Sequence, residues 1–201
     1  MKLYYVPRTR AARVRWLLEE LGVPYELVRL DPKAGDTRRP EYLAIHPQGH
    51  VPALEDGGAT MFESVAIVLQ LADRFAAAGL APAPGTPERG TYYQWIVFAL
   101  TELEPHVATY WYNAMSLPEP ERDASLAAKA REKFQASARV LERALDGKSW
   151  VLGERFSAAD VVVGAMVGWA RSAKLLDELP GLKSYLGRCL ERPANKRASA
   201  D

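Results

Sequence analysis

The segment HPQGHVPAL, residues 46–54, constrains the fold of this chain more than any other stretch. Residues 51–55 have the composition of a short strand, but Pro52 lies inside it. Proline has no backbone N–H to donate to a sheet ladder, so a regular central strand is disfavoured there. A cis Val51–Pro52 bond is one solution, because only proline adopts a cis peptide cheaply. Such a bond would turn the backbone of Val51 outward, where its N–H and C=O could pair with an extended peptide.

A turn, a second strand and a helix start follow directly. Asp-Gly-Gly at 56–58 predicts the turn, and residues 59–62 predict the returning strand. Ser64 stands just before an apolar-periodic run, where a serine caps a helix. The N-terminus of such a helix favours a carboxylate. The whole span therefore predicts an exposed backbone edge close to an anion site, which suits a small acidic peptide.

Two motifs in this span resemble signatures of the glutathione transferases. HPQGHVPAL resembles their third strand, and FESVAI, residues 62–67, resembles the start of their third helix. The C-terminal segment LPGLKSYLGRCLERPANKRA is also similar to the family, so the resemblance spans the chain, although Asn195 stands where many members carry an aromatic residue. The opening KLYY-x-P is shared with bacterial beta-class members. The resemblance implies a bacterial cytosolic glutathione transferase, beta/theta-like, with glutathione as co-substrate and no other cofactor.

The N-terminal part of the chain predicts a βαβ unit followed by the hairpin and a helix. Residues 2–6 and 25–30 have the aromatic and β-branched composition of strands. Between them, apolar residues over 14–21 recur at helical spacing. Two strands around one helix favour parallel pairing. This order is similar to the thioredoxin-like fold, and the cis proline belongs to that fold by resemblance.

Proline and glycine concentrate in residues 77–87 and mark a linker. We therefore expect a thioredoxin-like α/β domain over residues 1–76 and an all-α helical bundle over residues 88–201, the architecture of glutathione transferases. Pro105 predicts a bend in the first long helix of the bundle. Further on, Ser157 and Asp160 predict a reciprocal capping box at a helix N-terminus. This box resembles one in the family's C-terminal domain, and we assign Asp160 a structural role.

Composition argues against several classes of function. The net charge is +1, from 26 basic and 25 acidic residues without a long basic run, so nucleic acid is not an expected partner. No apolar stretch approaches the ~18 residues of a membrane span. Cys189 is the single cysteine, which excludes an internal disulfide and a cysteine-based metal cluster, and no metal site is predicted. Met1 leads into a strand-like run without a signal-peptide pattern, and this favours a cytoplasmic location.

The thiol of glutathione needs a group that stabilises its thiolate, because a free thiol has a pKa near ~8.5. By resemblance this group lies at the end of strand 1 or the start of helix 1. Beta-class members carry a cysteine at the position of Arg10, and its absence here excludes a mixed disulfide at that position. Thr9 matches the hydroxyl of serine-type members, Tyr5 offers a second hydroxyl, and Arg10 could add a positive field. The structural alternatives are a helix N-cap for Thr9 and a core position for Tyr5.

The resemblance also assigns residues to the rest of glutathione. The family uses the pair matching Glu63 and Ser64 for the γ-glutamyl end, with the serine hydroxyl and N–H on the carboxylate and the glutamate on the amine. Val51 and Pro52 form the backbone edge. His50 stands where the family has a lysine, glutamine or histidine that reaches the glycyl carboxylate or the cysteinyl backbone, and an exposed loop histidine is its alternative role.

The helical part of the chain contributes further candidates. Glu102 matches an acid that approaches the partner subunit's glutathione in similar dimers, although a solvated helix acid has the same pattern. Aromatic residues could line an apolar electrophile pocket or belong to the core: Tyr110, Trp111 and Trp169, together with Tyr112 and Met115. The helix that begins near Arg89 is long and carries Tyr92, Tyr93 and Trp95, which offer more apolar surface than one core face needs, and this predicts a homodimer.

These patterns favour conjugation of the glutathione thiolate to small apolar electrophiles. Two other functions are possible on the same fold. A non-catalytic, transferase-like interaction protein is disfavoured by the intact Glu63–Ser64 pair. A glutathione-dependent reductase or peroxidase is disfavoured in its disulfide-forming versions by the lack of an active-site cysteine, whereas peroxidase chemistry through a bound thiolate stays open.

Overall fold

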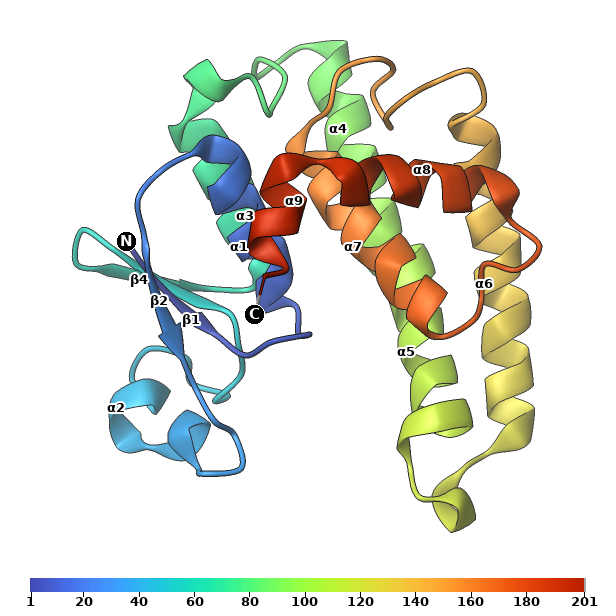
Figure 1. The fold of residues 1–201 in the computed structure, drawn as a ribbon, viewed down its shortest axis with the longest axis horizontal. Helices are drawn as coiled ribbons and strands as arrows, with labels where there is room; N and C mark the ends of the chain where they lie inside the picture. The colour runs from blue at the N-terminus through green and yellow to red at the C-terminus, as the bar shows by residue number, and fades with distance from the viewer. Residues whose placement is uncertain (201) are drawn as a thin grey trace. The chain divides into compact units, whose positions relative to one another are not determined.

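The computed structural model describes residues 1–200. It divides into two compact units, one formed by Met1–Ala81 with the described residues from Glu191 onward, the other by Pro82–Leu190 (Figure 1). The sequence predicted a different assignment of the last residues, which were grouped with the helical domain over 88–201. The structure groups the chain from Glu191 onward with the first unit instead, for a reason that lies in its side-chain contacts.

The first unit is a four-stranded mixed sheet with strand order β2-β1-β3-β4. The strands are β1 (Lys2–Tyr5), β2 (Glu26–Arg29), β3 (Ala53–Asp56) and β4 (Ala59–Phe62). Strands β1 and β2 pair in parallel, as the βαβ pattern predicted, and β3 pairs antiparallel with β1 and with β4. The fold is the expected thioredoxin-like one.

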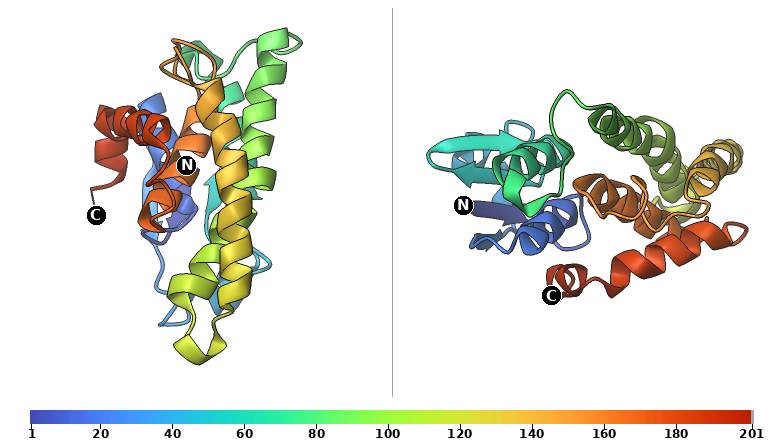
Figure 2. Two further views of the ribbon diagram at one scale, coloured as in Figure 1. Left: turned by 90° about the vertical axis from the view of Figure 1, so that its right-hand side faces the viewer. Right: turned by 90° about the horizontal axis from the view of Figure 1, so that it is seen from above.

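Helices cover this sheet because each has one apolar face. The helices of the first unit are α1 (Ala11–Leu21), α2 (Pro40–Leu43), α3 (Ser64–Arg74) and α9 (Pro193–Ala198), with 3₁₀ turns at Asp36–Arg38 and Ala76–Ala78. Helices α1 and α3 lie side by side against the sheet (Figures 1 and 2). Leu3 on β1, Leu17 on α1 and Ile67 on α3 have no exposed surface and form the centre of this core.

Arginine–carboxylate pairs hold α9 on α1. Arg192 donates two hydrogen bonds to the carboxylate of Glu20, with N–O distances of 2.6 and 2.7 Å. Arg197 donates to Glu19 at 2.7 Å. The buried Arg15 of α1 donates to the carbonyl oxygen of Ala200 at 3.1 Å. Bidentate arginine–carboxylate contacts fix geometry as well as adding energy, so these contacts explain why the C-terminal segment belongs to the first unit.

The second unit is all helical, as predicted, and its helices pack on one another (Figure 2). It contains α4 (Pro87–Phe98), α5 (Glu104–Trp111), α6 (Ala124–Ala144), α7 (Ala158–Ser172) and α8 (Pro180–Glu191), with a 3₁₀ turn at Glu119–Glu121. Two π-helical turns, Ala99–Leu103 and Tyr112–Ser116, flank α5. Pro105 lies in the first turn of α5. Because proline has no N–H to donate a helical hydrogen bond, the π-helical turn Ala99–Leu103 occurs just before it.

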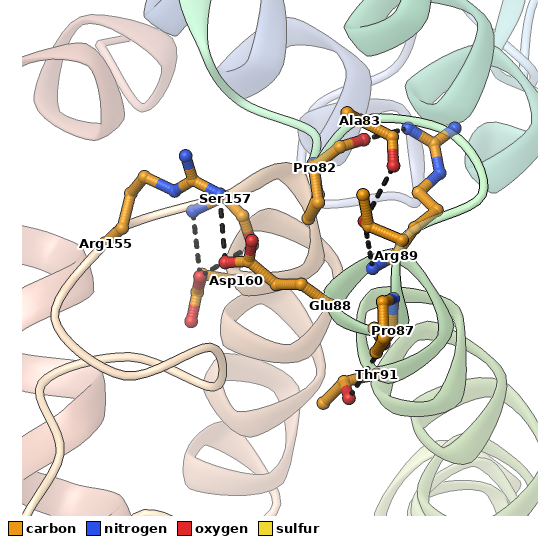
Figure 3. Close-up of polar contacts among 10 residues, drawn as sticks. Pro82, Ala83, Pro87, Glu88, Arg89, Thr91, Arg155, Ser157 and Asp160 are labelled. Carbon is orange, nitrogen blue, oxygen red and sulfur yellow. Dashed lines mark hydrogen bonds and ion pairs between the residues drawn. The ribbon is translucent and has the colours of Figure 1, made fainter.

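The predicted capping box is present at the start of α7. Ser157 is the N-cap residue, and Asp160, which is completely buried, accepts hydrogen bonds from the backbone N–H and the hydroxyl of Ser157 (Figure 3). The Asp160 carboxylate also accepts from the backbone N–H of Val151 at 2.9 Å and from the hydroxyl of Tyr185 at 3.0 Å. Burial raises the pKa of Asp160, and the hydrogen bonds oppose that rise. The residue therefore ties α7, α8 and the loop between α6 and α7 together.

We expect Asp160→Asn to lower the free energy of unfolding by about 2–4 kcal/mol, because the amide nitrogen cannot accept a hydrogen bond and leaves buried donors unpaired. Urea denaturation followed by circular dichroism measures the change. The control is Asp146→Asn, an exposed acid in the second unit, for which no comparable change is expected. An Asp160→Asn variant as stable as the parent would refute the role assigned to this network.

Candidate glutathione site

The strand register gathers the three sequence motifs at one end of the sheet. Tyr4 of β1 lies opposite Ala53 of β3, and Ala53 lies opposite Phe62 of β4. Since both pairs are antiparallel, the chain after β1, the chain before β3 and the chain after β4 leave the sheet at the same end. The loop after β1, the Val51–Pro52 segment and the Glu63–Ser64 junction are therefore brought together.

The Val51–Pro52 peptide bond is cis, which confirms the prediction made from the proline inside the strand pattern. The loop that precedes it is fixed at several points. The side chain of Arg38 donates to the carbonyl oxygen of Gln48 at 3.0 Å, and the hydroxyl of Tyr42 donates to the carbonyl oxygen of His50. Gly49 has φ +62°, and a Cβ there would lie 2.3 Å from the carbonyl oxygen of Thr37. Only glycine fits this position.

The junction between β4 and α3 differs from the expected capping arrangement. Glu63 is the N-cap residue, with the unusual backbone angles φ +69° and ψ +106°, and no side chain caps the helix. Ser64 is the first helical residue rather than the cap. Its hydroxyl is buried and accepts a hydrogen bond from Arg13 at 3.5 Å. An N-terminus without a side-chain cap keeps its orphan backbone donors for water or a ligand.

Thr9 is in the loop between β1 and α1, and its hydroxyl acts at both ends of that loop. It donates to the carbonyl oxygen of Val6 at 2.7 Å and accepts from the backbone N–H of Ala11 at 3.3 Å. A hydroxyl has a single proton to donate. Donation from Thr9 to a sulfur atom therefore requires rotation of the hydroxyl away from Val6. Arg10, at the N-cap of α1, is exposed.

The two tyrosines of β1 point to opposite faces of the sheet, as strand alternation requires. Tyr5 is 2% exposed, and its hydroxyl accepts from Arg15 at 3.5 Å. The hydroxyl of Tyr4 donates to Glu55 at 3.0 Å; burial, together with this bond, raises the pKa of Tyr4 to about 12. The burial of Tyr5 against α1 favours the structural role that the sequence left open for it.

Histidine and aromatic rings pack beside the Val51–Pro52 segment. His46, which is 3% exposed, has its ring centre 4.8 Å from that of Phe62 and 5.7 Å from that of His50. Burial lowers the pKa of His46, and the neighbouring His50 lowers it further. His46 therefore favours its neutral form, which fits a structural role. His50 is exposed at the end of the loop.

The remaining sequence candidates belong to the second unit. Glu102 is exposed in the first π-helical turn. Tyr110 and Trp111 on α5 and Trp169 on α7 are each half-buried. His106 is also half-buried on α5, and its pKa is lowered by burial and by Lys133. Within the described residues, the structure contains no cluster of three histidine, cysteine, aspartate or glutamate side chains that could hold a metal ion.

Sequence reasoning missed two features near the site. Arg13 and Arg15 of α1 are 3% and 8% exposed, although arginine at helix positions is usually solvated. Both residues flank Val14 in a helix that contacts α3 and α9, and no local pattern in the sequence marks them as buried. Arg8 adopts φ +59°, a left-handed conformation that nothing in its sequence neighbourhood indicates.

A thioredoxin-like unit with a cis proline beside an open helix N-terminus, followed by a helical unit, is the architecture of a glutathione-binding protein. Comparison with known proteins agrees with it. The family described as glutathione S-transferase, N-terminal domain, matches residues 1–73, and glutathione S-transferase, C-terminal domain, matches residues 109–188. The chain belongs to the glutathione S-transferase family and is a glutathione transferase.

Individual relatives are similar over nearly the whole chain. The Disulfide-bond oxidoreductase YfcG of Escherichia coli (strain K12) is 30% identical, and the match covers 98% of this chain and 93% of the relative. Among solved structures, the ternary complex of BphK, a bacterial GST, has a TM-score of 0.86 at 30% identity, covering 99% and 98% of the two chains. The sphingomonad glutathione S-transferase complexed with glutathione has a TM-score of 0.85 at 29% identity, covering 99% of this chain and 97% of that one.

Among the described residues, no helix is both long and apolar enough to span a bilayer.

We expect Ser64→Ala to weaken glutathione binding by about 1.5–3 kcal/mol, the contribution of one hydrogen bond to a charged group. Isothermal titration calorimetry with glutathione measures the affinity, and thermal unfolding reports any loss of fold. Ser125→Ala, at an exposed position on α6, serves as the control. Unchanged affinity in Ser64→Ala would mean that the γ-glutamyl carboxylate binds elsewhere.

Proposed function

We propose that this protein conjugates the thiolate of glutathione to small hydrophobic electrophiles. The observation that carries the proposal is the convergence, at one end of the sheet, of the Val51–Pro52 edge, the uncapped start of α3 at Ser64 and the loop that holds Thr9. In this arrangement Glu63 and Ser64 bind the γ-glutamyl end, and the backbone of Val51 pairs with the cysteinyl residue. His50 lies on the side of the glycyl carboxylate.

The start of α1 supplies the means of stabilising the thiolate. Thr9 releases its hydrogen bond to Val6 and donates a hydrogen bond to the thiolate sulfur instead. The N-terminal end of α1 carries partial positive charge, and the side chain of Arg10 adds to it. Thiolate and electrophile then react largely through proximity, because both are held next to each other. The half-buried aromatic residues Tyr110, Trp111 and Trp169 belong to the electrophile pocket in this proposal, and Glu102 approaches the glutathione of a partner subunit.

The proposal is tested by the thiol itself. We expect bound glutathione to show thiolate absorbance at a pH clearly below its usual pKa near ~8.5. Thr9→Val should raise the pKa of the bound thiol, because it removes the hydroxyl but keeps the shape. Tyr5→Phe should leave that pKa unchanged, because the Tyr5 side chain is buried against Arg15.

Three outcomes would change the assignment. A protein that does not bind glutathione, or binds it without forming a conjugate with a chloronitrobenzene, would favour a non-catalytic interaction protein. An effect of Tyr5→Phe alone would transfer the role to Tyr5. No effect of either variant would point to a backbone N–H or to Arg10 as the donor.

A second candidate function is glutathione-dependent disulfide reduction or peroxide reduction. It is favoured by the similarity to the relative described as a disulfide-bond oxidoreductase. Cys189, the single cysteine, is buried in α8, so such a reaction would use the thiols of glutathione and no protein cysteine. Oxidised glutathione as product, rather than a thioether, identifies this activity.

We also propose that the protein is a cytoplasmic homodimer of the beta/theta-like type. The sequence pointed to Tyr92, Tyr93 and Trp95 on α4 as surplus surface, but Tyr92 and Trp95 are buried within the single chain. Tyr93 and Val97, which are 43% and 54% exposed, are the apolar residues that α4 presents to a partner. We expect sedimentation at twice the chain mass, and Val97→Glu should shift the protein toward a monomer. A parent protein that sediments as a monomer at all concentrations would exclude the dimer and the cross-subunit role of Glu102.

A further inference from the structure

Backbone strain singles out Arg8. Among the described residues, three that are not glycine have positive φ values: Arg8 at 59°, Glu63 at 69° and Lys174 at 57°. A side chain with a Cβ is disfavoured in this region, and such residues concentrate at functional sites. Glu63 lies at the proposed γ-glutamyl subsite. Arg8 lies next to Thr9, at the proposed position of the sulfur.

The local fold gives no reason for an arginine at position 8. The hydrogen bond from the Thr9 hydroxyl to the Val6 carbonyl closes a turn with Pro7 and Arg8 at its centre. A turn with proline second and a positive φ third prefers glycine or asparagine at that third place. The side chain of Arg8 is exposed, so it adds nothing to the core. Glycine would serve the turn better, and the arginine therefore indicates a role for its side chain.

The charge around Arg8 favours an anion. The loop from Val6 to Arg10 contains no acidic residue but carries two exposed arginines, Arg8 and Arg10, and no acid lies in the first turn of α1. Guanidinium groups bind carboxylates with matched, bidentate geometry. A carboxylate placed against this loop meets complementary charge without a competing acid from the loop itself.

We propose that Arg8 is a specificity-determining residue that binds a carboxylate on the electrophile. The inference rests on the proposed function, in which the two carboxylates of glutathione are bound near Ser64 and His50. The sulfur then faces Thr9, so an anionic group met by Arg8 belongs to the second substrate. The preferred substrates are hydrophobic electrophiles that carry a carboxylate on the same ring or chain as the carbon that the thiolate attacks.

A matched pair of electrophiles tests this: 4-chloro-3-nitrobenzoate and its neutral analogue 4-chloro-3-nitrobenzamide. In both, the glutathione thiolate attacks the carbon that carries chlorine. The S–C bond forms, the C–Cl bond breaks, and chloride leaves with the bonding electron pair, while the thiol proton has already passed to solvent. The measured quantity is the ratio of kcat/KM for the benzoate to that for the benzamide. Each value is divided by the uncatalysed rate constant of the same electrophile.

We expect the parent protein to favour the benzoate. Arg8→Gln should lower the ratio about twofold to fivefold through the KM of the benzoate, since a solvent-exposed charge pair is weak. Arg8→Lys should retain part of the preference. Added salt should lower the parent's ratio and leave that of Arg8→Gln nearly constant.

Arg8→Gly separates the effect of the Arg8 side chain on substrate preference from its effect on stability. It should lower the ratio as Arg8→Gln does and raise the midpoint of thermal unfolding, because glycine relieves the left-handed strain. The matched control is Lys174→Gly, which relieves the same strain at an exposed position after α7. It should raise the midpoint but leave the ratio unchanged.

Two results would overturn the proposal. One is a benzoate-to-benzamide ratio near one in the parent protein that stays the same in every Arg8 variant. The other is a rise in the pKa of the bound glutathione thiol in Arg8→Gln, together with an equal loss of kcat/KM for both electrophiles. This result would mean that Arg8 acts on the sulfur. Calorimetry with glutathione distinguishes these results from failure of the proposed function, in which the parent protein would not bind glutathione at all.

Discussion

The site depends on one constraint, the antiparallel register that sets Tyr4, Ala53 and Phe62 side by side across three strands. Because side chains alternate along a strand, a slip of one residue would exchange the buried and exposed faces of the strand that slips. The same slip would separate Val51 from Ser64. The burial of Leu3 and Leu54 in the core therefore fixes how the Val51–Pro52 segment lines up with the start of α3.

Strain at the end of this sheet has a cost that the core must offset. Glu63 and Arg8 both have positive φ values, one on each side of the Val51–Pro52 segment in the sheet order. Each such residue destabilises the fold by roughly 1–3 kcal/mol. The first unit tolerates this because α1 and α3 bury an apolar face on the sheet. The stability that offsets this strain is thus supplied by residues remote from the strained positions.

Local patterns predicted much of this structure. The cis bond before Pro52, the turn at 56–58 and the Ser157–Asp160 box each express a short-range rule, and each is present, although β3 begins at Ala53, just after the proline. Features set by tertiary contacts were not accessible. The hydroxyl of Thr9 bonds to Val6 rather than pointing outward, and Ser64 starts α3 instead of capping it. The return of the C-terminal segment to α1 depends on pairs such as Arg192–Glu20, whose members lie at opposite ends of the chain.

Helix α1 joins these long-range contacts to the site. Arg13 donates to Ser64 at the start of α3, and Arg15 donates to Tyr5 beneath the sheet and to Ala200 in the C-terminal segment. Two buried cations on one helix are costly unless their partners are in place. The position of α1, and with it the loop that carries Arg8 and Thr9, therefore depends on both the α3 junction and the C-terminal segment. A disturbance at the far end of the chain would therefore reach, through this helix, the loop where we propose that the glutathione thiol binds.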